Sequence, residues 1–284
     1  MSAIIEQAPA KVNLTLEVRG RRPDGYHELR SIVAFAGFGD TLELWPDAEP
    51  GLEIAGPTAA ELAGPNLIAA AMDAVRTAWP AARLGRFRLT KRLPIAGGVG
   101  GGSADAAAAL RAIRTLNAGR SGAPDWVALA RRLGADVPVC LLGRLCVMTG
   151  IGETIALLPA IGRLHAVLVN PGVPLATAQV FAALGAPILP VGISWPAADD
   201  DAEAIHRRIH SGSNDLQAAA IGLVPAITDV LGALAGCASA SAVRLSGSGA
   251  TCFALFPDAA SCQAAAAQIK ATQSGWWVEP TTLT

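Results

Sequence analysis

The sequence contains no long apolar run: nowhere do about 18 uninterrupted apolar residues, the length typical of a membrane helix, follow one another. It has no basic block that would track a phosphodiester backbone, and its net charge is only −1. The N-terminal Met-Ser-Ala-Ile-Ile-Glu has neither the basic region nor the apolar segment of a signal peptide. We therefore expect a soluble cytoplasmic protein that binds neither membranes nor nucleic acid.

Cysteine is sparse and shows no ligand spacing. The cysteines stand among apolar neighbours without a Cys-x-x-Cys pair, and they are Cys140, Cys146, Cys237, Cys252 and Cys262. An odd number of scattered cysteines favours buried reduced thiols over disulfides or a zinc site. His206 and His210 stand four residues apart, but the arginines between them disfavour a bound cation. We expect surface histidines there and no metal site.

Apolar residues, in contrast, are abundant: they make up 52% of the 284 positions, against 16% charged residues. This composition supplies ample material for a core and little for disorder. Strand-like and helix-like segments are mixed without strict βα alternation, which predicts an α+β protein. A soft boundary near residue 160 gives two expected domains, residues 1–160 and 161–284, and residues 188–201 are expected to form an exposed loop. The patterning also predicts strands at residues 29–38, 40–45 and 164–170, a short helix at 126–133 that stops at Gly134, a loop at 136–142 and one helix at roughly 215–237.

The most informative stretch is residues 93–117. Five glycines in six positions lead directly into an alanine-rich segment whose apolar residues recur at helical spacing. Each glycine costs roughly 0.5–1 kcal/mol relative to alanine, and a plain turn needs only one or two. A glycine loop entering a helix N-terminus presents N–H groups and the positive end of the helix dipole. We interpret the loop as a phosphate site with Ser103 at the N-cap or in the first turn, the alternative being a flexible turn before a buried helix.

The loop matches neither of two common phosphate-binding motifs. A P-loop requires Lys-Ser/Thr after the last glycine, where this chain has Ser103-Ala104. The G-x-G-x-x-G pattern, started at Gly98, reaches Ser103 instead of a third glycine. The stretch instead resembles the Pro-x3-Gly-x-Gly-Gly/Ser-Ser-x-Ala loop of the galactokinase, homoserine kinase, mevalonate kinase and phosphomevalonate kinase superfamily.

Three further segments resemble one family of that superfamily. They are residues 9–16 continued by 22–31, residues 133–138, and residues 244–254. Pro-Ala-Lys-Val-Asn-Leu, followed by Asp-Gly-Tyr-His, is similar to the 4-diphosphocytidyl-2-C-methyl-D-erythritol kinase family. The motifs stand in the family's order from residue 9 to residue 254, so the resemblance covers essentially the whole chain.

The resemblance implies a two-lobed α+β small-molecule kinase fold with mixed sheets and packed helices. It implies ATP-dependent phosphorylation of the 2-hydroxyl of 4-diphosphocytidyl-2-C-methyl-D-erythritol in non-mevalonate isoprenoid precursor biosynthesis, with Mg²⁺ carried by ATP. Residues 1–160 would bind ATP and hold the catalytic groups, residues 161–284 would bind the substrate, and the protein would be a monomer or weak homodimer. The ATP-binding positions that the resemblance implies are Asn66, Pro94, Ile95, Ala96, Gly97, Gly98, Val99, Gly100, Gly101, Gly102, Ser103 and Ala104.

Two residues are candidates for catalysis. Phosphoryl transfer to an alcohol needs a phosphate cradle, a cation on the transferring group and a group that orients or deprotonates the hydroxyl. The resemblance assigns the base to Asp136 and its cationic partner to Lys11. Lys11 has apolar neighbours in a strand pattern, and an inward lysine there needs an anionic partner. Taken alone, Asp136 is typical of a turn cap and Lys11 of a solvated strand lysine.

Tyr26 and His27 suit recognition of cytosine, since an aromatic face stacks on a base and an imidazole hydrogen-bonds its edge. The resemblance adds Phe181 as a second aromatic, sandwiching the base, and Thr177 and Asn13 as hydrogen-bonding groups; Phe181 as a plain core residue stays open. The alternatives are a related kinase for mevalonate, homoserine or a sugar, and a non-catalytic nucleotide-binding module. Tyr26-His27 argues against the first, and the joint presence of Lys11 and Asp136 argues against the second.

Overall fold

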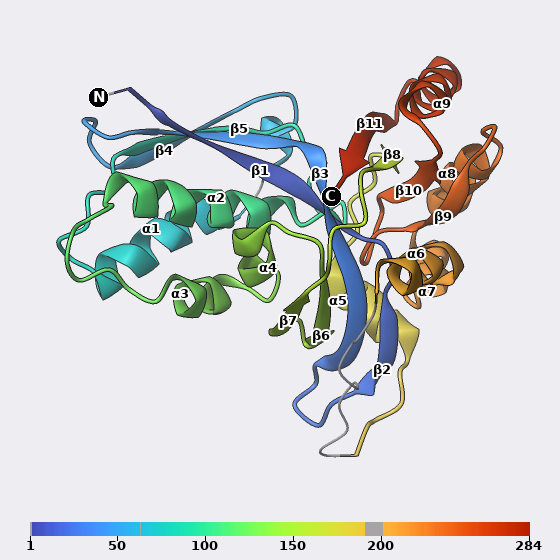
Figure 1. The fold of residues 1–284 in the computed structure, drawn as a ribbon, viewed down its shortest axis with the longest axis horizontal. Coiled ribbons are helices and arrows are strands. Elements are labelled where there is room, and N and C mark those ends of the chain that lie inside the picture. The colour runs from blue at the N-terminus through green and yellow to red at the C-terminus, as the bar shows by residue number, and fades with distance from the viewer. Residues whose placement is uncertain (1, 63, 191–200) are drawn as a thin grey trace. The chain divides into compact units, whose positions relative to one another are not determined.

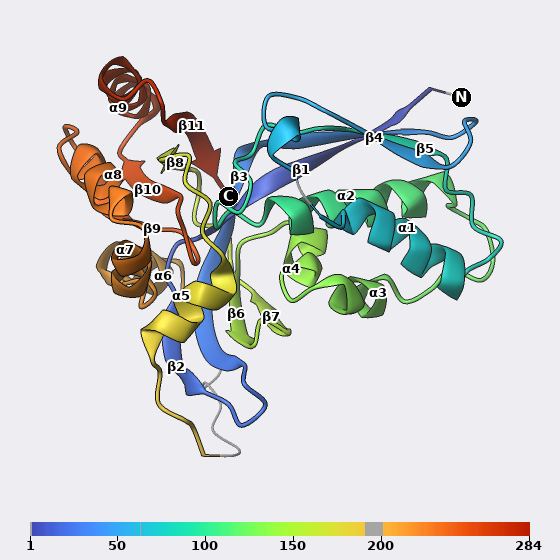
Figure 2. The same cartoon turned by 180° about the vertical axis from the view of Figure 1, so that it is seen from behind.

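The computed structural model describes residues 2–62, 64–190 and 201–284 (Figures 1 and 2). Helices and strands are mixed along the chain, so the predicted α+β class is confirmed. Most of the loop expected at residues 188–201 lies outside the described residues. The chain divides into two compact units, which interleave in sequence. Unit 1 is Met1–Ala10, Gly39–Ile95 and Gly100–Gly143, and unit 2 is Lys11–Phe38, Ala96–Val99 and Arg144–Thr284. The predicted division of function at residue 160 stays a prediction.

Unit 1 is built from a small sheet and a group of helices. In the sheet, β5 pairs antiparallel with the end of β3 and parallel with β4, and the strands are β3 (His27–Trp45), β4 (Gly51–Ala55) and β5 (Arg86–Thr90). The helices lie on one side of β4 and β5 (Figures 1 and 2) and are α1 (Leu67–Ala78), α2 (Gly101–Leu116), α3 (Trp126–Leu133) and α4 (Val137–Leu142). Helix α2 packs against the other three, and residues 104–110 are buried because their alanines allow close approach. The short 3-10 helix η1 (Ala59–Glu61) follows β4.

Two predictions about these elements were wrong. Residues 136–142 were expected to be a loop, but helix α4 begins directly after Asp136. Pro138 is tolerated because it lies in the first turn, where its missing N–H would have no intrahelical acceptor. The two strands expected at residues 29–38 and 40–45 are one continuous strand, β3. Gly39 permits this, since a Cβ there would lie 2.2 Å from the Ala8 carbonyl oxygen of the neighbouring strand β1 (Ile4–Asn13).

Unit 2 has an antiparallel sheet in which β8 lies between β11 and β10. Val169 of β8 stands opposite Cys252 of one neighbour and Val278 of the other. The strands are β8 (Leu164–Asn170), β9 (Ser241–Leu245), β10 (Cys252–Phe256) and β11 (Trp277–Leu283). Their apolar side chains form one core with helices α5 (Thr177–Leu184), α7 (Gln217–Leu223), α8 (Ala226–Ala235) and α9 (Ala259–Thr272). Helix α6 (Ala202–Ser211) contacts β9.

The first part of β3 also belongs to unit 2, where it pairs with β2 (Glu17–Arg21) and with β6 (Cys146–Gly150), which in turn pairs with β7 (Thr154–Leu157). The single helix expected at residues 215–237 is the pair α7 and α8. The break falls at Val224, because the residue before a proline is disfavoured in helical conformation.

All the cysteines are free and buried, as predicted. Among the residues that the structure describes, no helix is long and apolar enough to cross a lipid bilayer.

Candidate active site

The N-terminus of α2 is left without a side-chain cap. Its N-cap, Gly100, has left-handed backbone angles (φ 64°, ψ 24°) and no side chain to accept a hydrogen bond. Helices α1 and α3 differ, since the side chains of Asn66 and Asp125 accept hydrogen bonds from N–H groups in their first turns. The first N–H groups of any helix have no intrahelical acceptor. Those at the start of α2, where Ser103 lies in the first turn, are therefore suited to an anion.

The carbonyl groups of residues 97–99, which precede α2 and belong to unit 2, accept hydrogen bonds from other residues of that unit. Lys11 N–H donates to the Val99 oxygen at 2.9 Å, and Thr251 N–H donates to the Gly97 oxygen at 3.0 Å. The Ser246 hydroxyl donates to the Gly98 oxygen at 3.2 Å. In a planar trans peptide the C=O and the following N–H point in opposite directions. The N–H groups that follow these three carbonyls therefore point away from the protein donors, as a phosphate cradle requires.

The glycines of this loop serve different purposes. Gly98 has φ 74°, and a Cβ on it would lie 2.6 Å from the carbonyl oxygens of Ser246 and Gly249. Gly98 is therefore required by packing against the turn between β9 and β10. At Gly101 and Gly102 the nearest atoms to a Cβ would be 3.4 and 3.6 Å away and belong to side chains. Within unit 1, these two positions have room for a Cβ, so packing does not explain why they are glycines.

The two catalytic candidates occupy different kinds of position. Lys11 lies near the end of β1, in unit 2, and is only 5% exposed. Burial raises the pKa of the nearby Cys146 thiol to about 12, although the positive charge of Lys11 acts to lower it. Asp136 is half-buried at the N-cap of α4, in unit 1. The catalytic partnership of Lys11 with Asp136 stays a prediction.

Two of the predicted substrate-binding side chains contact each other. The rings of His27 and Phe181 lie 4.7 Å apart between centroids at an interplanar angle of 32°. Phe181 also packs against the core of unit 2, as expected for a core residue, and its role in substrate binding stays a prediction. Burial, followed by the nearby Arg21, lowers the pKa of His27, which is therefore a neutral imidazole near neutral pH. Tyr26 is 60% exposed at the tip of the β2–β3 hairpin.

Asn13 and Thr177 both lie next to serines of the β9–β10 turn. The Asn13 side-chain amide donates to the Ser31 hydroxyl at 2.7 Å, and its backbone N–H donates to the Ser246 hydroxyl at 3.2 Å. Among the described residues, the buried Oδ1 of Asn13 has no hydrogen-bond partner. The hydroxyls of Thr177 and Ser248 are hydrogen-bonded at 2.8 Å. An unpaired buried acceptor is costly, so Asn13 Oδ1 is a candidate to accept a hydrogen bond from a ligand.

The turn between β9 and β10 is the part of the site that sequence reasoning missed. Its Ser-Gly-Ser-Gly sequence lies within residues 244–254, one of the segments that resemble the family, but the sequence alone assigns no role to a residue of this turn. The Asn214 side chain fixes this turn, because its amide donates to the carbonyls of Leu245 and Gly247 at 2.9 and 2.7 Å. Ser246 and Thr251 in turn hold the glycine loop.

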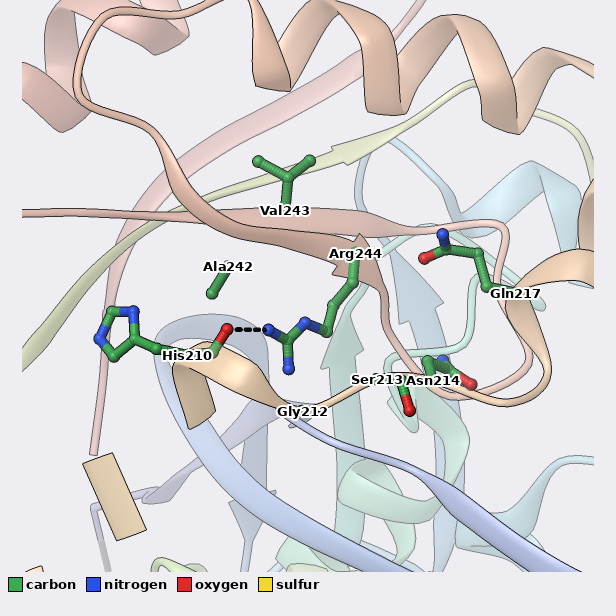
Figure 3. A pocket seen from close by; sticks show the side chains of 8 residues that line it. All are labelled: His210, Gly212, Ser213, Asn214, Gln217, Ala242, Val243 and Arg244. Carbon is green, nitrogen blue, oxygen red and sulfur yellow. Dashed lines mark hydrogen bonds between the residues drawn. The ribbon is translucent and has the colours of Figure 1, made fainter. Parts of the chain in front are cut away.

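Unit 2 also has a polar pocket of about 410 Å³, which none of the predicted site residues lines (Figure 3). Arg244 in its wall is 5% exposed, and burial lowers its pKa. Its guanidinium donates to the carbonyls of Leu14 and His210 at 2.8 and 3.1 Å, and it lies 5.9 Å from the Phe253 ring centroid. Arg244 thus connects β9 to α6 and to the segment after β1.

Comparison with known proteins places this arrangement in a family. The model of the GHMP kinases N terminal domain matches residues 66–144, and that of the GHMP kinases C terminal matches residues 196–274. A 4-diphosphocytidyl-2-C-methyl-D-erythritol kinase of Methylorubrum extorquens (strain PA1) is 49% identical over the full length of both chains.

Solved structures agree with these matches. A crystal structure of 4-(cytidine 5'-diphospho)-2C-methyl-D-erythritol kinase aligns with a TM-score of 0.78 at 35% identity, covering 99% of each chain. Homoserine kinase from Cytophaga hutchinsonii shares the fold, with a TM-score of 0.65 at 19% identity over 99% of this chain and 96% of its own. The expected superfamily fold is therefore confirmed. The chain belongs to the 4-diphosphocytidyl-2-C-methyl-D-erythritol kinase family of the GHMP kinases.

Proposed function

We propose that the protein transfers the γ-phosphoryl group of ATP to the 2-hydroxyl group of 4-diphosphocytidyl-2-C-methyl-D-erythritol, a step of isoprenoid precursor biosynthesis. The family membership and the full-length relatives of that name support this substrate. The main structural support is the N-terminus of α2, where an uncapped helix follows a loop whose carbonyls are already bonded. Such a site binds phosphate through N–H groups and the helix dipole.

In the proposed reaction, Asp136 accepts the proton of the substrate hydroxyl, and the oxygen of that hydroxyl bonds to the γ-phosphorus. The bond between that phosphorus and the β–γ bridging oxygen breaks, and ADP leaves. Lys11 offsets the negative charge on the transferring group, and the N–H groups at the start of α2 bind the phosphates. The residues described contain no group of three or more His, Cys, Asp or Glu side chains that could hold a metal ion. Mg²⁺ would be bound mainly by the phosphate oxygens of ATP, where it would neutralise charge.

The cytidine group is proposed to bind near Tyr26, His27 and Phe181. His27 and Phe181 already contact each other, so a base does not fit between those two rings. It would stack instead on Tyr26 or on an outer face of the pair. A neutral His27 offers one donor and one acceptor to the base edge, and Asn13 Oδ1 offers a buried acceptor. Thr177 adds a hydroxyl that is held by Ser248.

A panel of alcohols tests this proposal. ADP release is measured in a coupled assay with the purified protein, ATP and Mg²⁺, using 4-diphosphocytidyl-2-C-methyl-D-erythritol, mevalonate, homoserine and galactose in parallel. We expect turnover with the first alcohol and background rates with the others. Turnover restricted to one of the other alcohols, or ATP hydrolysis that no alcohol stimulates, would contradict the proposed substrate.

A further inference from the structure

A buried cluster of three ionisable side chains lies within unit 1, beside the glycine loop. Lys91 directly follows β5, Asp40 is in β3 and Asp105 is in α2, and they are 1%, 0% and 3% exposed. The Lys91 ammonium donates to Asp105 Oδ2 at 2.8 Å and also forms an ion pair with Asp40. None of these residues was predicted from the sequence to have a role.

The cluster holds the chain where it enters the loop. Asp40 Oδ1 accepts hydrogen bonds from the backbone N–H groups of Arg92 at 2.5 Å and Leu93 at 2.9 Å. These residues directly precede Pro94, the first of the predicted ATP-binding loop positions. The Lys91 backbone N–H is itself bonded to the Ala55 carbonyl at 2.7 Å. The residues that lead into the loop are therefore held in one conformation.

The same cluster holds the helix that leaves the loop. Asp105 is the fifth residue of α2, so its bond to Lys91 ties the start of α2 to the end of β5. A Cβ on Gly101, the first residue of α2, would lie 3.4 Å from the Lys91 ammonium nitrogen. The cation therefore lies close to the first turn, whose N–H groups are proposed to bind phosphate.

Folding stability alone does not account for such a cluster. The desolvation cost of buried charges often equals or exceeds their attraction, and apolar side chains of similar volume commonly serve as well. Asp105 Oδ1 also has no hydrogen-bond partner among the described residues. Hydrogen bonds to charged groups are directional, so they fix the positions of the atoms that they join. Apolar packing does not provide this.

We propose that Asp40, Lys91 and Asp105 act as one positioning cluster that holds the glycine loop and the start of α2 in the conformation that binds ATP. This inference rests on the proposed function. The side chains of the cluster are buried, so it acts through the backbone of residues 92–93 and through α2. It therefore sets the affinity for ATP, whereas the affinity for the alcohol depends on Tyr26, His27 and Phe181, which belong to unit 2.

Asp105→Asn is the first test, because it keeps the shape and one acceptor for Lys91 while removing the ionisable carboxyl group. The double variant Lys91→Met/Asp105→Leu replaces two of the charges by apolar groups of similar size and is the second test if the single variant folds poorly. Glu6→Gln is the matched control, since Glu6 forms an ion pair with Arg111 of α2 at 2.8 Å, away from the loop. Each protein is assayed for thermal stability, calorimetric ATP affinity, and KM for both substrates.

We expect the Kd and KM for ATP to rise about tenfold or more in the cluster variants, since small displacements of positioning groups have large effects. The KM for the alcohol should change less than about twofold, and the control should match the wild type in both. Unchanged ATP affinity in the folded variants, or an equal rise in both KM values, would overturn the positioning role. Failure of the wild-type protein to bind ATP would instead contradict the proposed function, and this inference with it.

Discussion

At the scale of single residues, the environment decides which protonation state and which exposure a side chain has. His27 is neutral because it is partly buried near Arg21, although histidine by itself titrates near neutral pH. Asp105 lies beside Lys91 and still keeps its proton to higher pH, because its burial outweighs that attraction and Asp40 adds repulsion. Tyr26 is next to His27 in sequence and is 60% exposed, so it is free to meet a ligand.

Replacing Tyr26 tests cytosine recognition. Tyr26→Ala should raise the KM for the alcohol about tenfold or more, because stacking of a base on an aromatic ring is worth on the order of 1–3 kcal/mol. The KM for ATP and the melting temperature should stay close to those of the wild type, since an exposed side chain adds little to the core. Steady-state kinetics with each substrate varied in turn measures both constants. An equal loss for both substrates would point to a folding defect instead.

The buried carboxyl of Asp105 predicts a pH-dependent stability. Burial raises its pKa from 3.8 to about 7 in the folded protein, with Lys91 lowering it and Asp40 raising it. The folded state therefore binds the proton more tightly, and this contribution to stability is complete below the unfolded pKa and lost as the pH rises toward 7. Relative to Asp105→Asn, the wild type should lose free energy of unfolding between about pH 4 and 7, by up to about 1.4 kcal/mol per pH unit. Urea unfolding of both proteins across this range measures the free energy of unfolding against pH. Parallel profiles of the two proteins would contradict the raised pKa of Asp105.

At the scale of elements, the sequence predicts helices and strands whose ends are marked by nearby residues. Helix α3 begins after the cap Asp125 and ends at Gly134, and strand β8 has the predicted bounds. Strand β6 was missed because it is defined by pairing with residues 29–33, more than 100 positions earlier in the sequence. The contacts of Lys91 with Asp40 and Asp105 span 51 and 14 positions. Such pairs leave no local pattern in a single sequence.

The glycine loop provides a prediction at the element scale. Gly98→Ala should destabilise the protein by roughly 1–3 kcal/mol, because the new Cβ would meet two backbone oxygens at positive φ. Gly101→Val should leave the melting temperature closer to that of the wild type and weaken ATP binding, because its methyl groups occupy the approach to the N–H groups of α2. Thermal unfolding and calorimetric titration of both variants separate the two effects. ATP affinity unchanged in folded Gly101→Val would remove the loop from the phosphate site.

At the scale of the whole molecule, the sequence motifs predicted the family and the fold, and the structure adds how they are held. Lys11, the glycine loop and residues 246–251 are far apart in the chain, yet the carbonyls of Val99, Gly98 and Gly97 accept hydrogen bonds from Lys11, Ser246 and Thr251. Motif recognition supplied the residues, but it could not supply these bonds. The roles of the site residues rest on the reaction that the molecule is proposed to perform.

The central claim is that Asp136 and Lys11 work as one catalytic unit. Asp136→Asn keeps the shape and removes the basicity, so turnover should fall about a hundredfold or more, within the usual range for loss of a general base. Lys11→Met should cause a comparable loss, with the binding of both substrates nearly intact. Residues that act as a unit give non-additive effects, so the double variant should be scarcely slower than the slower single variant.

Steady-state kinetics of the wild type, the two single variants and the double variant test this claim most directly. We predict that kcat falls by similar factors in all three variants while both KM values stay near those of the wild type. If Asp136→Asn retains most of its turnover, Asp136 is not the base. If the losses of the two single variants multiply in the double variant, Lys11 and Asp136 act independently and the account of catalysis is contradicted.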